Sequence, residues 1–288
     1  MKVDFFIIGA PKAGTTSLYY YLSEHPQIQM SSQKETDYFS SQNIQNQGMY
    51  YRRNRVSTLE KYKSLFTQKE GVIYGEASVS YMYYDTVAND IKKYNPNAKI
   101  IVILRNPIDR AFSHYLMDYR LGLVSDSFEK IINRQSKHQY ASLFYQQYVL
   151  VSKYYEQLKR YFDVFDREQI LVLDYQDFKT ETSKTLESVY KFLDIDIDYL
   201  ANTATRHNTF SMPKNAIIRF FYSIVGLRKL FNIFFSEKMK EVVRVKLFRA
   251  GEKPKISLET KQQLKQLFRD DIYRVSKLID KDLIEWIK

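Results

Sequence analysis

Residues 3–22, VDFFIIGAPKAGTTSLYYYL, constrain the fold of this chain more than any other stretch. The apolar run at 3–8 has the composition and length of a strand that is buried on both faces. Glycines and a proline then break the pattern, and the hydroxyls at 15–17 favour a helix start before the apolar run at 18–22. A strand, a glycine-containing loop and a helix N-terminus bring N–H groups and a positive dipole end to one point, an arrangement that binds phosphate.

The loop in this stretch differs from the P-loop motif GxxxxGK[ST], in which a lysine directly follows the last glycine. Thr15 stands at that position here, and Lys12 precedes Gly14. Lys12 and the hydroxyls add donors for an anionic group, and an ordinary strand-to-helix turn with a surface lysine is the alternative interpretation. An ATP-dependent P-loop kinase would also need a carboxylate for Mg²⁺ after a second buried strand, a position at which Asp174 follows the apolar run 169–173.

A second signal follows the buried strand expected at 99–104, KIIVIL. This strand places Arg105 at its carboxyl end, where α/β sheets bind ligands, and Pro107 favours a helix start just beyond. Ser113 lies about two helical turns into that helix. A guanidinium and a hydroxyl can therefore converge on one phosphate, and a surface arginine in an ion pair is the alternative interpretation.

Both motifs resemble those of sulfotransferases that use 3′-phosphoadenosine 5′-phosphosulfate (PAPS) as donor. PKAGTTSL is similar to the 5′-phosphosulfate loop of that family, and LRNPIDRAFSHY is similar to its 3′-phosphate motif. The resemblance implies a donor site that leaves 3′-phosphoadenosine 5′-phosphate (PAP) as product. The implied ligands of the 5′-phosphosulfate are Lys12, Ala13, Gly14, Thr15, Thr16 and Ser17, and those of the 3′-phosphate are Arg105 and Ser113.

Three further segments resemble motifs of the family, and the first two resemble the branch that acts on glycans. KETDYF at 34–39 is similar to its KExxxF segment, GEASVSY at 75–81 to GExSPxY, and DKDLIEW at 280–286 to the terminal GRDLxxW. Val79 replaces the usual proline of the second segment. The implied acceptor is a hydroxyl, or as a second choice an amine, of a glycan or glycolipid.

The resemblance also implies roles in an in-line displacement at sulfur, which needs a base for the attacking group and cationic donors for the leaving oxygen. Glu35 is the implied base, and Lys12 the implied stabiliser of the leaving group. An ion pair with Lys34 is the alternative interpretation of Glu35. His25 and His114 are rival bases, because another branch of the family uses histidine.

Two other positions follow from the resemblance alone. Glu76 is expected to orient Lys12 or the acceptor. Family members have a late loop that faces the nucleotide or acceptor, and Arg206, His207 and Asn208 lie at its position here. The usual lysine–glycine motif of that loop is missing.

The remaining pattern predicts an α/β fold with a P-loop-like, doubly wound and mostly parallel sheet flanked by helices, and a helical C-terminal part. One domain over 1–288 is expected, with a polar surface insertion at 42–58. The expected strands are 3–8, 28–30, 72–78, 99–104 and 169–173. The expected helices are 15–22, 59–66, 86–94, 108–121, 126–134, 141–162, 180–193 and a last helix that begins with a capping box at Ser257.

The net charge and residue composition of the chain limit the kinds of partner that it is expected to bind. Lys plus Arg exceed Asp plus Glu by 44 to 33, a net charge of +11 that favours nucleotides, nucleic acid, anionic glycans or membrane surfaces. A basic nucleic-acid-binding module is therefore an alternative function, but no recognised motif accompanies the charge, and nucleic acid is not an expected partner. The chain has no cysteine, four scattered histidines and no HExxH, so no disulfide and no metal site are expected.

The expected location is cytoplasmic, because the first strand begins too close to Met1 for a cleaved signal peptide. Residues 214–235, KNAIIRFFYSIVGLRKLFNIFF, are strongly apolar with interspersed basic residues. They predict an amphipathic helical pair that folds over the sheet, and peripheral contact with a membrane surface is the alternative interpretation.

Overall fold

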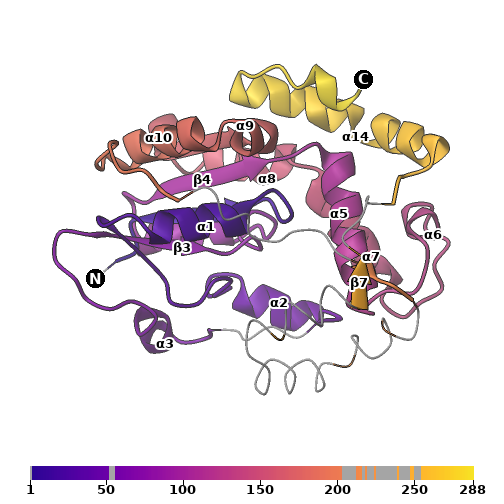
Figure 1. The fold of residues 1–288 in the computed structure, drawn as a ribbon, viewed down its shortest axis with the longest axis horizontal. Helices are drawn as coiled ribbons and strands as arrows, with labels where there is room; N and C mark the ends of the chain where they lie inside the picture. The colour runs from indigo at the N-terminus through magenta and orange to yellow at the C-terminus, as the bar shows by residue number, and fades with distance from the viewer. Residues whose placement is uncertain are drawn as a thin grey trace.

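The chain folds around a five-stranded parallel sheet (Figure 1). The computed structural model describes residues 2–51, 56–202, 212–215, 218, 224, 239, 247–249 and 254–288. The strands are β1 Phe5–Gly9, β2 Ile28–Met30, β3 Ile73–Ala77, β4 Lys99–Leu104 and β5 Ile170–Asp174, in the spatial order β2-β3-β1-β4-β5. A second, antiparallel sheet consists of β6 Met212–Pro213 and β7 Phe248–Arg249.

The two most apolar strands lie side by side in the sheet. Every residue of β1 is buried, and so is every residue of β4 after Lys99. Phe5 of β1 pairs with Lys99 on one side and with Gly75 of β3 on the other. Because β1, β3 and β4 run parallel, the segments that follow them meet at one edge of the sheet. The segments that follow β1 and β4 carry Lys12 and Arg105.

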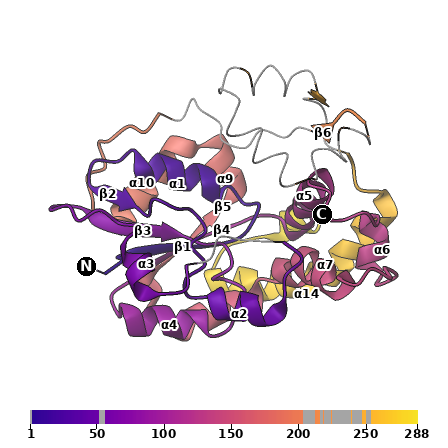
Figure 2. The same ribbon diagram turned by 90° about the horizontal axis from the view of Figure 1, so that it is seen from below.

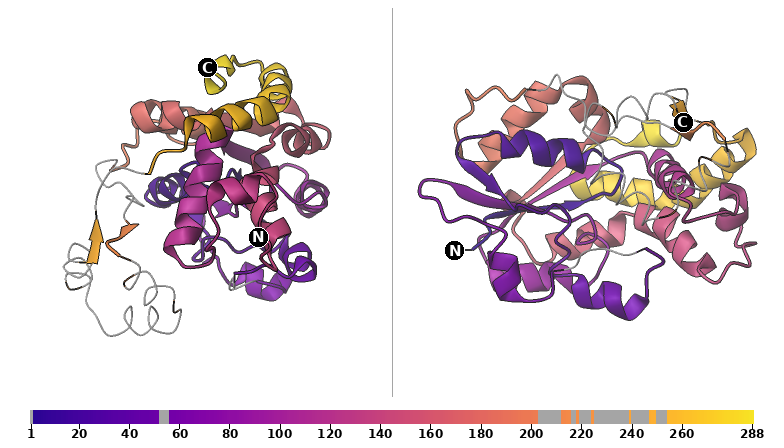
Figure 3. Two further views of the ribbon diagram at one scale, coloured as in Figure 1. Left: turned by 90° about the vertical axis from the view of Figure 1, so that its right-hand side faces the viewer. Right: turned by 60° about the horizontal axis from the view of Figure 1, so that its bottom comes forward.

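Helices cover both faces of the sheet, so the predicted doubly wound, parallel fold is confirmed. α1, α9 and α10 lie on one face and α3, α4 and α14 on the other (Figure 2), and the tilted view agrees (Figure 3, right). The helices are α1 Thr15–Ser23, α2 Ser41–Gln47, α3 Leu59–Lys63, α4 Val87–Tyr94, α5 Pro107–Arg120, α6 Phe128–Ile132, α7 Ala141–Tyr148, α8 Tyr155–Phe162, α9 Tyr175–Thr180, α10 Thr182–Leu193 and α14 Leu258–Ile279, with 3₁₀ turns η1 Leu150–Ser152, η2 Arg167–Gln169 and η3 Ile284–Trp286.

Two helix starts show the predicted capping chemistry. Pro107 is the first residue of α5, and the side-chain oxygen of Asn106 accepts the N–H of Ile108 at 3.0 Å. At the start of α14 the Ser257 hydroxyl accepts the N–H of Thr260 at 3.1 Å. The long helix α14 then packs by an apolar stripe on α8 and α5. The buried members of that stripe are Leu264, Phe268, Ile272 and Val275.

The single helix expected at 141–162 is wrong, because the structure divides this segment into α7, η1 and α8. The break comes from contacts with other helices. The buried guanidinium of Arg110 on α5 donates to the carbonyl oxygens of Gln147 and Tyr148 at 2.6 and 3.0 Å, which ends α7. The carboxylate of Asp271 on α14 accepts the N–H groups of Tyr154 and Tyr155, which begins α8.

The polar segment at 42–58, which was expected as a surface insertion, is hydrogen-bonded to the helices beside it. Its first part forms α2, and residues 52–55 lie outside the described residues. The amide of Gln47 donates to Gln146 of α7 at 2.5 Å, and the hydroxyl of Tyr50 donates to the buried Asp118 of α5 at 2.5 Å. The segment therefore docks on α5 and α7 through buried polar contacts.

Some predictions lie outside the described residues. These are the loop at Arg206, His207 and Asn208 and most of the stretch 214–235. In the part of the chain that the structure describes, no helix has the length and apolar character needed to cross a membrane. The single domain over 1–288 stays a prediction.

Candidate active site

The loop between β1 and α1 has the tight geometry that its glycine predicts. Gly14 precedes α1 with φ 89°, a left-handed conformation that favours glycine. A Cβ atom at Gly14 would lie 3.2 Å from the ring of Phe178 and 3.3 Å from that of Tyr175, so α9 packs tightly against the loop. Thr15 is buried, and Thr16 and Ser17 are half-buried in the first turn of α1. The helix N-terminus and these hydroxyls therefore lie together, as the phosphate-loop prediction requires.

Arg105 joins the two predicted phosphate motifs. It follows β4 directly, and its guanidinium donates a hydrogen bond to the carbonyl oxygen of Lys12 at 2.9 Å. The guanidinium carbon lies 4.7 Å from the centre of the Tyr175 ring, which holds the side chain over the loop. The Arg105 Nε is buried and has no hydrogen-bond partner among the described residues. A buried donor of this kind is unfavourable unless a ligand oxygen completes it.

Ser113 lies two turns into α5 and is half-buried. In the described part of the chain no hydrogen bond joins its hydroxyl to Arg105. Both residues lie on the segment that follows β4, Arg105 directly after the strand and Ser113 on α5.

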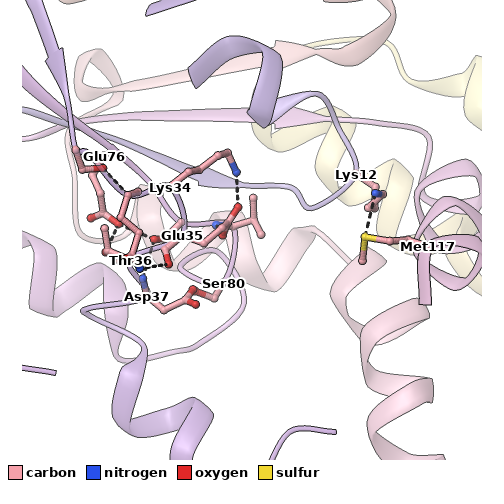
Figure 4. Close-up of polar contacts among 12 residues, drawn as sticks. Lys12, Lys34, Glu35, Thr36, Asp37, Glu76, Ser80 and Met117 are labelled. Atoms are coloured by element: carbon pink, nitrogen blue, oxygen red, sulfur yellow. Dashed lines mark hydrogen bonds and ion pairs between the residues drawn. The ribbon is translucent and has the colours of Figure 1, made fainter. Parts of the chain in front are cut away.

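Lys12 extends from the loop toward α5 (Figure 4). Its backbone has φ 70°, and its Nζ lies 3.3 Å from the sulfur of Met117. The neighbouring Asp118 is buried, and its carboxylate accepts the hydroxyls of Tyr50 and Tyr148 at 2.5 and 2.8 Å. Burial raises the pKa of Asp118 to about 6, against smaller lowering effects of those hydrogen bonds and of the Lys12 charge. Lys12 thus lies where a cation can meet developing negative charge next to the loop.

Glu35 lies on the segment after β2, where it is held by its neighbours (Figure 4). Its carboxylate forms an ion pair with Lys34 and accepts the N–H of Val79 at 2.9 Å. Its own N–H donates to the carbonyl oxygen of Ala77 at 2.9 Å. The Glu35 side chain remains 27% exposed, so it is both anchored and accessible. The Lys34 pairing that was the alternative interpretation is present beside the Val79 contact.

Glu76 does not make the contacts that the sequence suggested. It is fully buried in β3, and its carboxylate accepts hydrogen bonds from hydroxyls rather than from Lys12. These hydroxyls belong to Thr36, Tyr62, Ser78 and Tyr81. Burial raises the pKa of Glu76 to about 7, although all four hydrogen bonds favour the ionised form.

The two histidines that are alternative candidates for the base are both in contact with other groups of the protein. The Nδ1 atom of His25 accepts the N–H of Gln27 at 3.1 Å, so its Nε2 carries the proton that is donated to the carbonyl oxygen of Asp196 at 2.9 Å. His114 is buried on α5, with its Nδ1 3.3 Å from the guanidinium of Arg110. The Nε2 atom of His114 lies 3.9 Å from the carboxylate of Asp118, so each of the two histidines contacts other groups of the protein.

Two aromatic residues near Arg105 were missed by the sequence analysis. The hydroxyl of Tyr154 donates to the Arg105 carbonyl oxygen at 2.8 Å, and the ring of Tyr154 meets Trp286 edge-on at 6.3 Å. The side-chain amide of Asn106 donates to the Trp286 carbonyl oxygen at 3.1 Å. The DKDLIEW segment therefore packs next to Arg105. The resemblance of this segment to a family motif did not indicate where in the fold the segment would lie.

A hollow of about 510 Å³ lies at the α9–α10 junction and is lined by Tyr21 and residues 179–184, none of which is a predicted site residue. Within the described ranges, no group of three or more His, Cys, Asp or Glu side chains lies close enough to hold a metal ion.

A family model described as "Sulfotransferase domain" matches residues 2–222, which include both phosphate motifs and the Glu35 segment. The chain belongs to the sulfotransferase family. The predicted family and enzyme class are thereby confirmed, and the family uses PAPS as its sulfuryl donor. The family match supports neither of the two alternative functions, the P-loop kinase and the nucleic-acid-binding module.

The sulfotransferase fold is supported along the whole chain. A crystal structure titled sulfotransferase from Alicyclobacillus acidocaldarius superposes with a TM-score of 0.74 and 26% identity, covering 100% of both chains. Human bifunctional heparan sulfate N-deacetylase/N-sulfotransferase 1 is 28% identical over 285 residues, which are 96% of this chain and 29% of that protein. Human carbohydrate sulfotransferase 15 is 26% identical over 66% of this chain and 43% of its own length. The chain thus spans less than half the length of these curated relatives.

Proposed function

We propose that this sulfotransferase moves a sulfuryl group from PAPS to a hydroxyl of a carbohydrate-containing acceptor, with an amine as the second choice. The observation that carries the proposal is the hydrogen bond from Arg105 to the Lys12 carbonyl oxygen. It joins the predicted 3′-phosphate motif to the predicted 5′-phosphosulfate loop, while the Arg105 Nε stays buried without a partner among the described residues. A donor with phosphates at both ends would satisfy these groups together.

In the proposed donor site, the N–H groups and hydroxyls of residues 13–17 hold the 5′-phosphosulfate at the N-terminus of α1. The residues assigned to it are Lys12, Ala13, Gly14, Thr15, Thr16 and Ser17. Arg105 and Ser113 hold the 3′-phosphate, which requires the half-buried Ser113 hydroxyl to meet the ligand rather than Arg105 itself.

In the proposed transfer, the acceptor oxygen forms a bond to sulfur while the bond from sulfur to the 5′-phosphate oxygen breaks. Glu35 takes the proton of the attacking group, and PAP leaves with the electron pair of the broken bond. The Lys12 ammonium balances the charge that develops on the leaving oxygen. No metal ion takes part.

The glycan acceptor is supported by the Glu35 segment and by the relatives. The names of the two curated relatives given above describe a heparan sulfate N-sulfotransferase and a carbohydrate sulfotransferase. A glycolipid would meet the enzyme at a membrane surface, where the basic and apolar stretch 214–235 is the proposed contact. A cytoplasmic location remains a prediction.

The test measures donor binding and transfer separately. Calorimetry compares PAP with ATP plus Mg²⁺ on the full chain, and radiolabelled PAPS then reports transfer to three acceptors. These are a desulfated glycosaminoglycan with free amino groups, its N-acetylated counterpart, and vesicles that contain a neutral glycolipid. PAP binding tighter than ATP binding, with label on the N-acetylated glycan, supports the proposal. Equal binding of ATP with Mg²⁺, and no label on any acceptor, would contradict it.

A further inference from the structure

A fully buried carboxylate lies beneath the Glu35 segment and has no part in the proposed transfer. Glu76 is 0% exposed, and each of its oxygens accepts two hydroxyl hydrogen bonds. Oε1 accepts Thr36 and Ser78 at 2.6 Å each, and Oε2 accepts Tyr62 at 2.8 Å and Tyr81 at 3.1 Å. A carboxylate has about four acceptor positions, so Glu76 is fully satisfied without a ligand.

The donors to Oε1 also hold the backbone around Glu35. The Ser78 hydroxyl accepts the N–H of Asp37 at 3.0 Å, and the Thr36 hydroxyl accepts the N–H of Tyr38 at 3.2 Å. Glu76 therefore fixes two hydroxyls, each of which receives a backbone N–H from the residues that follow Glu35. Figure 4 shows Glu76, Thr36 and Asp37 close to one another.

This support is needed because the segment has an unfavourable backbone. Glu35 has φ 58° and Asp37 has φ 52°, both in the left-handed region that residues other than glycine rarely adopt. Such a backbone persists only where its surroundings determine it. Three further contacts come from the last residue of β3 and the segment after it. The Val79 N–H binds the Glu35 carboxylate, the Ala77 carbonyl accepts the Glu35 N–H, and the Ser80 hydroxyl binds Asp37.

We propose that Glu76 is a positioning residue for Glu35 and acts through the Thr36 and Ser78 hydroxyls on its Oε1 side. Its effect on turnover rests on the proposed function, whereas its effect on the backbone of residues 35–38 does not. On the Oε2 side, Tyr62 of α3 anchors the carboxylate in the core. The Tyr81 hydroxyl on that side also accepts the N–H of Phe39 at 3.3 Å and lies 3.2 Å from the Thr36 hydroxyl, so Tyr62 gives the cleaner control.

The experiment removes one hydroxyl from each side of Glu76 in the full chain. Thr36→Val deletes an Oε1 donor with little change in shape, and Thr36→Ser restores the hydroxyl. Tyr62→Phe is the matched control, because it deletes a buried donor to the same carboxylate from the Oε2 side. Turnover, the KM for the acceptor, the Kd for PAP and amide hydrogen exchange of residues 35–38 are measured for each variant.

We expect Thr36→Val to lower kcat about 100-fold, the size of effect that a small misplacement of a catalytic group produces. The Kd for PAP should stay within about threefold of wild type, Thr36→Ser should regain most of the rate, and Tyr62→Phe should keep kcat within about threefold. Faster amide exchange at 35–38 should appear in Thr36→Val alone.

Equal losses in Thr36→Val and Tyr62→Phe, or unchanged amide exchange in Thr36→Val, would overturn the inference and leave Glu76 as a core group only. If the wild type itself transfers no sulfuryl group to any acceptor, the proposed function fails. The exchange measurement then still decides whether Glu76 positions the segment.

Discussion

The guanidinium of Arg105 donates a hydrogen bond to the carbonyl oxygen of Lys12 at 2.9 Å. This bond joins the segments that follow β1 and β4, which are far apart in the sequence. A ligand that binds Arg105 is therefore linked directly to the backbone of the β1–α1 loop. The same arginine stacks on Tyr175, which also packs against Gly14. The β1–α1 loop, Arg105 and α9 are therefore in mutual contact. The first two predictions test whether this arrangement supports donor binding.

Arg105→Ala should weaken PAP binding about 10- to 100-fold, because hydrogen bonds to charged groups contribute about 1.5–3 kcal/mol. Arg105→Lys should not restore it, since an ammonium cannot reproduce the planar set of donors that reaches both the Lys12 carbonyl and a phosphate. Calorimetric titration with PAP measures both. Arg274→Ala is the control, because Arg274 pairs with Glu156 on the exposed surface. A normal Kd in Arg105→Ala would remove Arg105 from the donor site.

Gly14→Ala should destabilise the protein and weaken PAP binding, because a Cβ atom would press on Phe178 and Tyr175 at a left-handed φ of 89°. Gly48→Ala separates the two causes, since Gly48 has φ 64° but nothing within 4 Å of its added Cβ atom. We expect Gly14→Ala to lose about 1–3 kcal/mol more stability than Gly48→Ala, the usual penalty of overpacking. Urea unfolding measures the difference, and equal losses would show that the loop is not crowded by α9.

Glu35→Gln should lower kcat about 10²- to 10⁴-fold while PAP binds normally, because the amide cannot accept the acceptor's proton. Glu60→Gln on the exposed side of α3 is the matched control and should keep the wild-type rate. The measurement is the steady-state transfer of label from PAPS. If Glu35→Gln retained full turnover and His25→Gln lost it, the base would be the histidine.

Burial raises the pKa of Glu76 from 4.5 to about 7, so its carboxyl holds a proton more tightly in the folded than in the unfolded chain. The stability that this provides is complete below pH 4.5 and is lost as the pH rises through about 7. Relative to Glu76→Gln, the wild type should therefore lose about 2–3 kcal/mol of unfolding free energy between pH 5 and pH 8. Urea unfolding of both proteins across this range gives the difference. A difference that is constant, or that grows in favour of the wild type with rising pH, would contradict the raised pKa.

The elements that were predicted well from the sequence are those whose own residues show that they are buried. The strand at 99–104 was predicted with its observed bounds, because an unbroken apolar run has few alternatives in an α/β protein. The phosphate loop and Arg105 were predicted because their chemistry lies within short segments. Their hydrogen bond confirms that the two segments meet, whereas the catalytic roles stay predictions.

The features that the sequence did not predict depend on contacts between distant segments. Glu76 was expected to orient Lys12 or the acceptor, but its hydrogen-bond partners come from the segment after β2, from α3 and from the residues after β3. Nothing local to Tyr154 or Trp286 indicated that they would lie next to Arg105. Periodicity describes which face of an element is buried, and it does not identify what that face meets.

The buried guanidinium of Arg110 has a consequence for how this chain tolerates change. It ends α7 by binding carbonyl oxygens 37 and 38 residues further along, so the break in the 141–162 segment is specified from α5. Side chains at 147 and 148 can vary without removing those carbonyls, because the bonds are made by the main chain. A substitution at Arg110 itself would remove the guanidinium from both carbonyls, although the Ser152 hydroxyl would still donate to that of Tyr148, and it would allow the segment to follow its own helical pattern. Homologues that keep an arginine here should thus accept more sequence drift in the broken segment than homologues that have lost it.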